Sequence, residues 1–349
     1  MLPVNSGGHT AYQTFVLENL RKYYPDPTVF AKSTWDIIER FWNLDLSYTD
    51  ELLRSKYSVF GPKPRTPSCM QRSYLLSIDF KVHSLTDWAA QLKINPLYAI
   101  LSGFPFGDTP GVGTFYDFLG RLWDSDSDHL SPHIHPVKKK KVRKPKQKGE
   151  KAKSIEKITV EQLFHSLESS SFSIDEQPFA SLFKIYNHEF LSISIAKGLI
   201  DTSSLSIASD GMPVVTSARE RKHRICECSE NGVTSCDRYF SQPDCDIGYD
   251  SSRDCFYHGY DLYMLVAANS ESDLPIFPLL NPASKHDSHG FLETYFRFKS
   301  FLPDFHVRKW LLDSAHDAMS YYLYCRENNI QPFIDLNEKR GISMKYKDD

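Results

Sequence analysis

The chain has 349 residues and a net charge of −3, and 41% of its residues are hydrophobic and 13% aromatic. This composition supports a packed core in one large domain or two smaller ones. No stretch reaches the roughly 18 consecutive apolar residues of a membrane-spanning helix, and no charged start followed by an apolar segment marks a signal peptide. We therefore expect a soluble cytoplasmic protein without a membrane partner.

Helical patterns dominate residues 1–135, where apolar side chains recur at helical spacing between turn signals. The glycine- and proline-rich stretch 103–113 predicts a turn, and Thr114 is expected to cap the helix after it. A helix, a turn and a short helix are compatible with DNA docking, although ordinary helical packing explains the same pattern. The helices are expected near residues 15–20, 35–42, 84–101 and 115–122.

A basic segment at 136–155 is the best candidate for a domain boundary. Between residues 138 and 153, ten Lys or Arg stand against the single Glu150, which leaves −12 for the rest of the chain. Blocks of like charge often serve as arms that bind nucleic acid, and a solvated linker or a localisation-like patch are the alternatives. The DNA-binding candidates here are Lys138, Lys139, Lys140, Lys141, Arg143 and Lys144.

After a return to helix at about 160–186, the pattern changes at residue 205 to short strands separated by loops and helices. The sequence predicts three strands, a helix, a strand, a helix and a last strand, which is an α/β plan. The strands are expected at 205–209, 256–268, 275–280, 307–312 and 331–336, and the helices at about 291–301 and 318–325.

Two of these predicted strands end at an aspartate. The run 205–209 leads to Asp210 and then Gly211, and the run 307–312 leads to Asp313. If the two strands are neighbours in one sheet, both carboxylates can reach the same divalent cation, since Mg²⁺ is held by one or two carboxylates plus waters and phosphate oxygens. Either aspartate alone is also explained by local hydrogen bonding at a turn.

Five of the seven cysteines lie within thirty residues. The odd total and the absence of a signal peptide argue against a disulfide framework. The spacing differs from the paired Cys-x₂₋₄-Cys of common zinc sites, so zinc and reduced thiols in an exposed loop both remain open. The possible zinc ligands are Cys226, Cys228, Cys236 and Cys245.

A second basic patch lies just before the cysteines, close in sequence to Asp210. A phosphate backbone bound at Asp210 would have to pass this patch, and exposed surface charge explains it almost as well. Its candidate DNA-binding residues are Arg219, Lys222 and Arg224.

Taken together, these segments resemble the DDE transposases of bacterial insertion sequences. The matching segments, in chain order, are GVGTFYDF at 111–118, SDGMPV at 209–214, FYHGYDLY at 256–263, ASKHDS at 283–288, LDSAHD at 312–317 and PFID at 332–335. The resemblance spans most of residues 70–340, and the order of the motifs is more specific than any one of them.

The resemblance implies an α/β fold with an RNase H-like mixed sheet, preceded by an all-helical N-terminal region. The implied divisions are a helical DNA-binding-type region at 1–135, the basic linker at 136–155, and a catalytic domain at 156–349 with a cysteine-containing insertion at 217–255. Asp210 and Asp313 would then be catalytic ligands of Mg²⁺ or Mn²⁺. The partners would be double-stranded DNA and a further copy of the chain, in the cytoplasm at the nucleoid.

The family also needs a third acid, usually Glu, on a helix after the fifth strand. The chain ends at Asp349, soon after that strand, and Asp335 and Glu338 at the strand end are poor substitutes. We therefore expect a C-terminally incomplete domain. The alternatives are a catalytically inactive DNA-binding remnant of a transposase and, less favoured, a zinc-stabilised interaction module.

Overall fold

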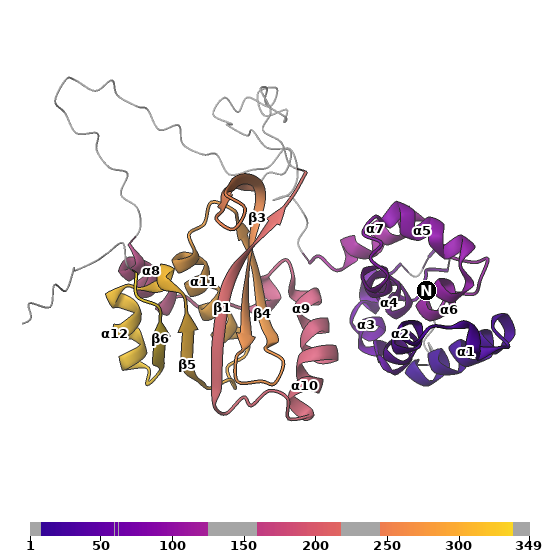
Figure 1. The fold of residues 1–349 in the computed structure, drawn as a ribbon, viewed down its shortest axis with the longest axis horizontal. Coiled ribbons are helices and arrows are strands. Elements are labelled where there is room, and N and C mark those ends of the chain that lie inside the picture. Colours follow the sequence, from indigo (N-terminus) through magenta and orange to yellow (C-terminus); the bar gives the residue numbers. More distant parts are fainter. Residues whose placement is uncertain (1–7, 59, 62, 125–158, 218–244, 338–349) are drawn as a thin grey trace, which may run out of the picture. The chain divides into compact units, whose positions relative to one another are not determined.

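The computed structural model describes residues 8–58, 60–61, 63–124, 159–217 and 245–337. The chain divides into two compact units, one formed by residues 1–125 with 177–193 and the other by residues 126–176 with 194–349 (Figure 1). The basic segment 136–155 lies outside the described residues.

The N-terminal unit is all-helical, as the sequence predicted. Its buried core includes Val16, Trp88 and Phe115, which come from helices far apart in sequence. The elements are α1 (Gly8–Tyr23), η1 (Pro27–Val29), α2 (Lys32–Asn43), α3 (Ser47–Leu52), η2 (Arg54–Lys56), α4 (Pro67–Asp79), α5 (Leu85–Ile94), α6 (Pro96–Ser102), α7 (Val112–Arg121), α9 (Ala180–Tyr186) and the π-helical turn η5 (Asn187–Leu191).

The predicted turn between α6 and α7 is present, but the predicted cap of α7 is wrong. Gly103 ends α6 with a φ of 88°, a left-handed conformation that glycine adopts without strain. The N-cap of α7 is Gly111, so Thr114 lies inside the first turn of the helix. Gly111 can cap because glycine is tolerated at this position even without a side-chain hydrogen bond.

Residues 177–193 group with the N-terminal unit, although the sequence assigned them to the C-terminal domain. Glu189 is 3% exposed and accepts hydrogen bonds from the backbone N–H and hydroxyl of Thr49 and from the side-chain amide of Gln71. These contacts join positions 140 and 118 residues apart in sequence. Such long-range polar contacts leave no local sequence signal.

Replacing Glu189 with alanine is expected to lower the free energy of unfolding by about 2–4 kcal/mol, because three buried hydrogen bonds lose their acceptor. Urea denaturation measures the effect, with exposed Glu18→Ala in α1 as the control. Equal stability of the two variants would show that this buried cluster contributes nothing.

The C-terminal unit contains a mixed sheet and its covering helices. The elements are α8 (Val160–Glu168), η4 (Ile174–Glu176), β1 (Leu205–Val215), β2 (Asp246–Asp250), β3 (Cys255–Ala267), β4 (Leu274–Pro282), α11 (Asp287–Phe301), β5 (Val307–Leu312), η6 (Ser314–His316), α12 (Met319–Glu327) and β6 (Gln331–Ile334). The short helix α10 (Ser192–Ala196) spans the division between the two units.

The sheet has an antiparallel half and a parallel half. Strand β3 pairs antiparallel with β1, β2 and β4, whereas β5 pairs parallel with β1 and with β6. The strand order is β2-β3-β1-β5-β6, with β4 also paired to β3. Strand β1 is therefore the centre of the sheet, where the two halves meet (Figure 1).

One face of the sheet is covered by α11, which packs against β1, β3 and β4, and α8 lies on α11 and α12. The side chains between these layers are largely aromatic. Trp310 of β5 is fully buried, and its ring meets those of Phe291 and Tyr295 edge-on, while Tyr324 stacks on it. This aromatic layer fixes the end of β5 against α11.

Two strand predictions need correction. The first strand does not end at Asp210, because β1 continues to Val215 in antiparallel pairing with β3. Pro213 is tolerated there, since the pairing of β1 with β5 stops at Ala208 and no ladder is interrupted on that side. In addition, β2 is an extra strand inside the predicted insertion 217–255, so four strands rather than three precede α11.

Candidate acidic site

The two predicted aspartates occupy equivalent positions on neighbouring parallel strands. Ala208 of β1 pairs with Leu311 of β5, and Asp210 and Asp313 each lie two residues further along. Neighbouring strands are about 5 Å apart. Continuing this register by two residues puts Asp210 level with Asp313, just beyond the end of β5.

Asp313 is held through one of its two carboxylate oxygens. Its Oδ1 accepts hydrogen bonds from the Ala315 backbone N–H at 3.2 Å and from Nδ1 of His316 at 2.6 Å. No described residue donates to Oδ2, and the side chain is 55% exposed. Asp313 thus presents an anchored carboxylate with one oxygen available to a ligand.

Asp210 resembles Asp313 in that only one of its two carboxylate oxygens accepts a hydrogen bond from a described residue. Its side chain is exposed, Oδ1 accepts from the backbone N–H of Gly211 at 2.8 Å, and no described residue donates to Oδ2. Two neighbouring carboxylates with one available oxygen each provide hard oxygen ligands of the type that Mg²⁺ and Mn²⁺ take.

Two further acids that the sequence reasoning did not assign lie beside this pair. Asp261 of β3 is 8% exposed, and its carboxylate lies over Gly211, where an added Cβ would come within 2.8 Å of both its oxygens. Asp287 is the first residue of α11. Asp261 falls on the buried face of β3, where charged side chains are rare.

The electrostatics show that these acids act on one another. Burial, followed by the charges of Asp287 and Asp210, raises the pKa of Asp261 to about 6. Burial is also the largest cause that raises the pKa of Asp287, and the charges of Asp313 and Asp210 add to it, while His286 and His316 oppose it. Asp210, Asp261, Asp287 and Asp313 are therefore linked by charge repulsion through Asp261 and Asp287.

An open groove adjoins Asp313 at the ends of β5 and β6. Its volume is about 710 Å³, and it brings His286 at the start of α11 next to Asp313. Asp335 lines the same groove, and its backbone N–H donates to the carbonyl of Leu312. The groove therefore leaves Asp313 accessible from solvent.

No group of three His, Cys, Asp or Glu side chains in the described parts of the chain is arranged to hold a metal ion. The carboxylate pair Asp210 and Asp313 fits a cation that keeps most of its coordination positions for water and phosphate oxygens. The two carboxylates are thus suited to hold Mg²⁺ or Mn²⁺ weakly, and they do not form a site in which the protein supplies all the ligands.

Most of the other predicted site residues fall outside the described residues. Cys245 is described and is buried just before β2, so at least this cysteine is not in an exposed loop. The predicted residues outside the described ranges are Lys138, Lys139, Lys140, Lys141, Arg143, Lys144, Arg219, Lys222, Arg224, Cys226, Cys228 and Cys236.

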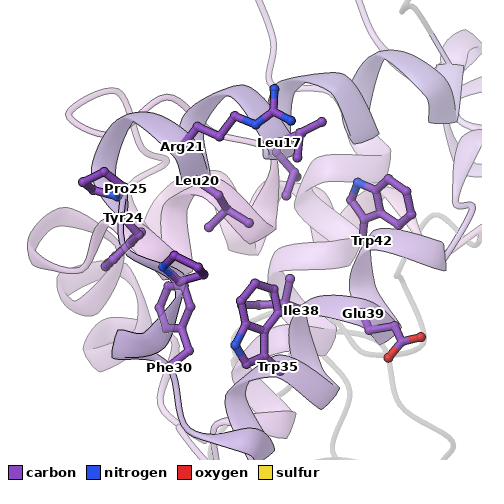
Figure 2. A pocket seen from close by; sticks show the side chains of 12 residues that line it. Leu17, Leu20, Arg21, Tyr24, Pro25, Phe30, Trp35, Ile38, Glu39 and Trp42 are labelled. Carbon is purple, nitrogen blue, oxygen red and sulfur yellow. The ribbon is translucent and has the colours of Figure 1, made fainter.

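The N-terminal unit has a pocket of its own, with a volume of about 610 Å³. Leu20 of α1 faces Trp35 and Ile38 of α2 across it, and Arg21 and Glu39 lie at its edge (Figure 2). The lining is otherwise apolar and aromatic, so the pocket lacks the converging ionisable groups of a catalytic site.

Comparisons of the chain with protein-family models, with curated proteins and with solved structures found no match. In the described residues, no helix combines the length and the apolar character that crossing a membrane requires.

Proposed function

We propose that this chain is a DDE-type transposase that cleaves DNA and transfers strands at the ends of an insertion sequence. The observation that carries the proposal is that β1 and β5 are parallel neighbours with Ala208 opposite Leu311, so that Asp210 and Asp313 each lie two residues beyond that pair. The order of elements supports it: β1, β3 and β4 pair antiparallel, then α11, β5, α12 and β6 follow, as expected for an RNase H-like domain with one added strand.

The chemistry follows from the two available carboxylate oxygens. When bound, Mg²⁺ or Mn²⁺ would supply Lewis-acid stabilisation of the charge that develops on a phosphodiester. Asp210 and Asp313 would hold the ion through Oδ2, and the groove beside Asp313 would receive the scissile phosphate. In hydrolysis, water forms a new P–O bond and the 3′ oxygen leaves. In strand transfer, that 3′-hydroxyl attacks a phosphate of the target.

The second candidate function is DNA binding without cleavage. The observation that favours it is that only two of the predicted three acidic ligands are identified among the described residues. In this case the chain would occupy transposon ends, alone or together with an intact transposase.

Incubation with duplexes that carry the sequences flanking the gene separates these candidates. The transposase proposal predicts nicking at a defined position in Mg²⁺ or Mn²⁺ and no nicking in EDTA. DNA binding without nicking in Mg²⁺ or in Mn²⁺ would contradict the transposase proposal and would support DNA binding without cleavage.

Both candidates predict DNA binding that weakens steeply with salt. One variant replaces all six basic candidates within 138–144 with glutamine. In a plot of the logarithm of the DNA association constant against the logarithm of the salt concentration, the slope is expected to become shallower by up to about 5, because each lost phosphate contact contributes about 0.9 to this slope. The control variant replaces exposed Arg308, Lys309 and Arg326 of the C-terminal unit. An unchanged slope in the six-residue variant would contradict a role for this segment in DNA binding.

We also propose that the active form is an oligomer that holds paired DNA ends at the nucleoid, as the resemblance implies. Zinc at the cysteine cluster is a separate proposal. Metal analysis of the purified chain tests it, and less than about 0.1 zinc per chain would exclude it.

A further inference from the structure

His316 connects the candidate site to the core of the sheet. The side chain is 1% exposed, although it lies only three residues from the half-exposed Asp313. Its two ring nitrogens have different partners: Nδ1 is 2.6 Å from Oδ1 of Asp313, and Nε2 is 2.8 Å from the hydroxyl of Tyr263. One imidazole therefore bridges the end of β5 and the centre of β3.

The direction of the hydrogen bond to Tyr263 and the position of the proton on the His316 ring depend on each other. Burial raises the pKa of Tyr263 well above its ordinary value, so its hydroxyl stays protonated and can donate. When that hydroxyl donates to Nε2 of His316, the proton of the neutral ring resides on Nδ1. The Nδ1–H group then donates to Asp313.

The ring of His316 is also fixed by packing. Phe291 of α11 and Tyr321 of α12 meet it edge-on, with ring centroids 5.5 Å away in both cases. The hydroxyl of Tyr321 donates in turn to the carbonyl of Ser288 at 2.5 Å, which ties α12 to the start of α11. A ring held from two helices and one strand has little freedom to reorient.

We propose that His316 is a positioning residue for the acidic site: through Nδ1–H it fixes Oδ1 of Asp313 and turns Oδ2 toward the cation, and Tyr263 sets its tautomer. The inference rests on the proposed function, because it assumes that Asp313 is a cation ligand. Residues that orient metal ligands from behind typically change metal affinity by about 10–100-fold when they are replaced.

A matched pair of variants separates positioning from packing. In His316→Asn the side-chain amide nitrogen takes the place of Nδ1 and retains a donor to Asp313. In His316→Gln the amide reaches the place of Nε2, near Tyr263, and the donor to Asp313 is lost. Each variant sacrifices one of the two hydrogen bonds, so a purely structural role predicts similar effects for both.

The experiment titrates Mn²⁺ into the full chain and records the loss of the free-ion signal by electron paramagnetic resonance. We expect His316→Gln to weaken Mn²⁺ binding by about 10-fold or more and His316→Asn by less than about 3-fold. In the ¹⁵N spectrum of the histidines, we expect the proton of His316 on Nδ1. The resonance that disappears in His316→Asn identifies this residue. In Tyr263→Phe we expect the fraction of His316 protonated on Nε2 to increase.

Three results would overturn the inference. Equal losses of affinity in the two His316 variants would make the residue structural, and unchanged affinity in both would remove it from the site. These two results concern the inference alone, provided that the wild-type chain binds Mn²⁺ and that Asp210→Asn and Asp313→Asn weaken binding. A wild-type chain that binds no Mn²⁺ would remove the proposed function and the inference together.

Discussion

Replacing Asp313 with asparagine is expected to reduce metal-dependent DNA cleavage by about 10³-fold or more. Asparagine keeps the shape of the side chain and removes the charge that the cation needs, which costs several kcal/mol of transition-state stabilisation. Asp210→Asn is expected to have an equal effect, because Asp210 and Asp313 each lie two residues beyond the paired Ala208 and Leu311. The measurement is the initial rate of nicking in Mg²⁺ and in Mn²⁺.

The control for these variants is Asp304→Asn, which removes one exposed carboxylate from the loop between α11 and β5. Its cleavage rate should match that of the wild-type chain, and all three variants should bind DNA at least as tightly as the wild type. Full activity in either Asp210→Asn or Asp313→Asn would refute the assignment of that residue.

The second large effect is on stability and concerns Asp261. Its pKa rises from an ordinary value of 3.8 to about 6 in the folded chain, so the ionised carboxylate disfavours folding. The contribution of this group to stability is greatest below pH 4 and falls as the pH rises through about 6. We therefore expect Asp261→Asn to raise the free energy of unfolding at pH 7 by about 2 kcal/mol.

Urea denaturation of wild type and Asp261→Asn at several pH values tests this expectation. The difference between the two should be small near pH 4 and should grow between pH 4 and pH 7. Added Mg²⁺ should stabilise the wild-type chain more than the variant, because a cation offsets the repulsion among the carboxylates. A variant that is less stable than wild type at pH 7 would contradict the account of Asp261.

The sequence predicted the pair of aspartates because each follows an apolar run, and neighbouring parallel strands bring such ends together. It did not identify Asp261 or Asp287, because their closeness depends on the register of β3 with β1 and on the packing of α11. Neither the register of two strands nor the packing of a helix can be read from a local sequence pattern. The burial of position 261 follows from the sheet that forms around β3 and not from an alternation in the sequence, because the residues after Asp261 are apolar on both faces of the strand.

The extents of the strands were less predictable than their existence. Strand β5 begins and ends where the sequence predicted, since apolar residues and the following Asp313 define it on both sides. Strand β1 runs six residues past its predicted last residue, Ser209, because pairing with β3 continues beyond Asp210. A glycine and a proline in that stretch favour a turn when only local propensity is considered.

The most direct test of the central claim is to locate the divalent cation on the chain. Fe²⁺ in place of Mg²⁺, with ascorbate and peroxide, generates hydroxyl radicals that cut the backbone close to the bound ion. If Asp210 and Asp313 hold the ion, the cuts lie near both residues and are abolished by excess Mg²⁺ and by Asp210→Asn or Asp313→Asn. Cuts confined to other segments, or cuts that persist in both variants, would contradict a cation site between β1 and β5.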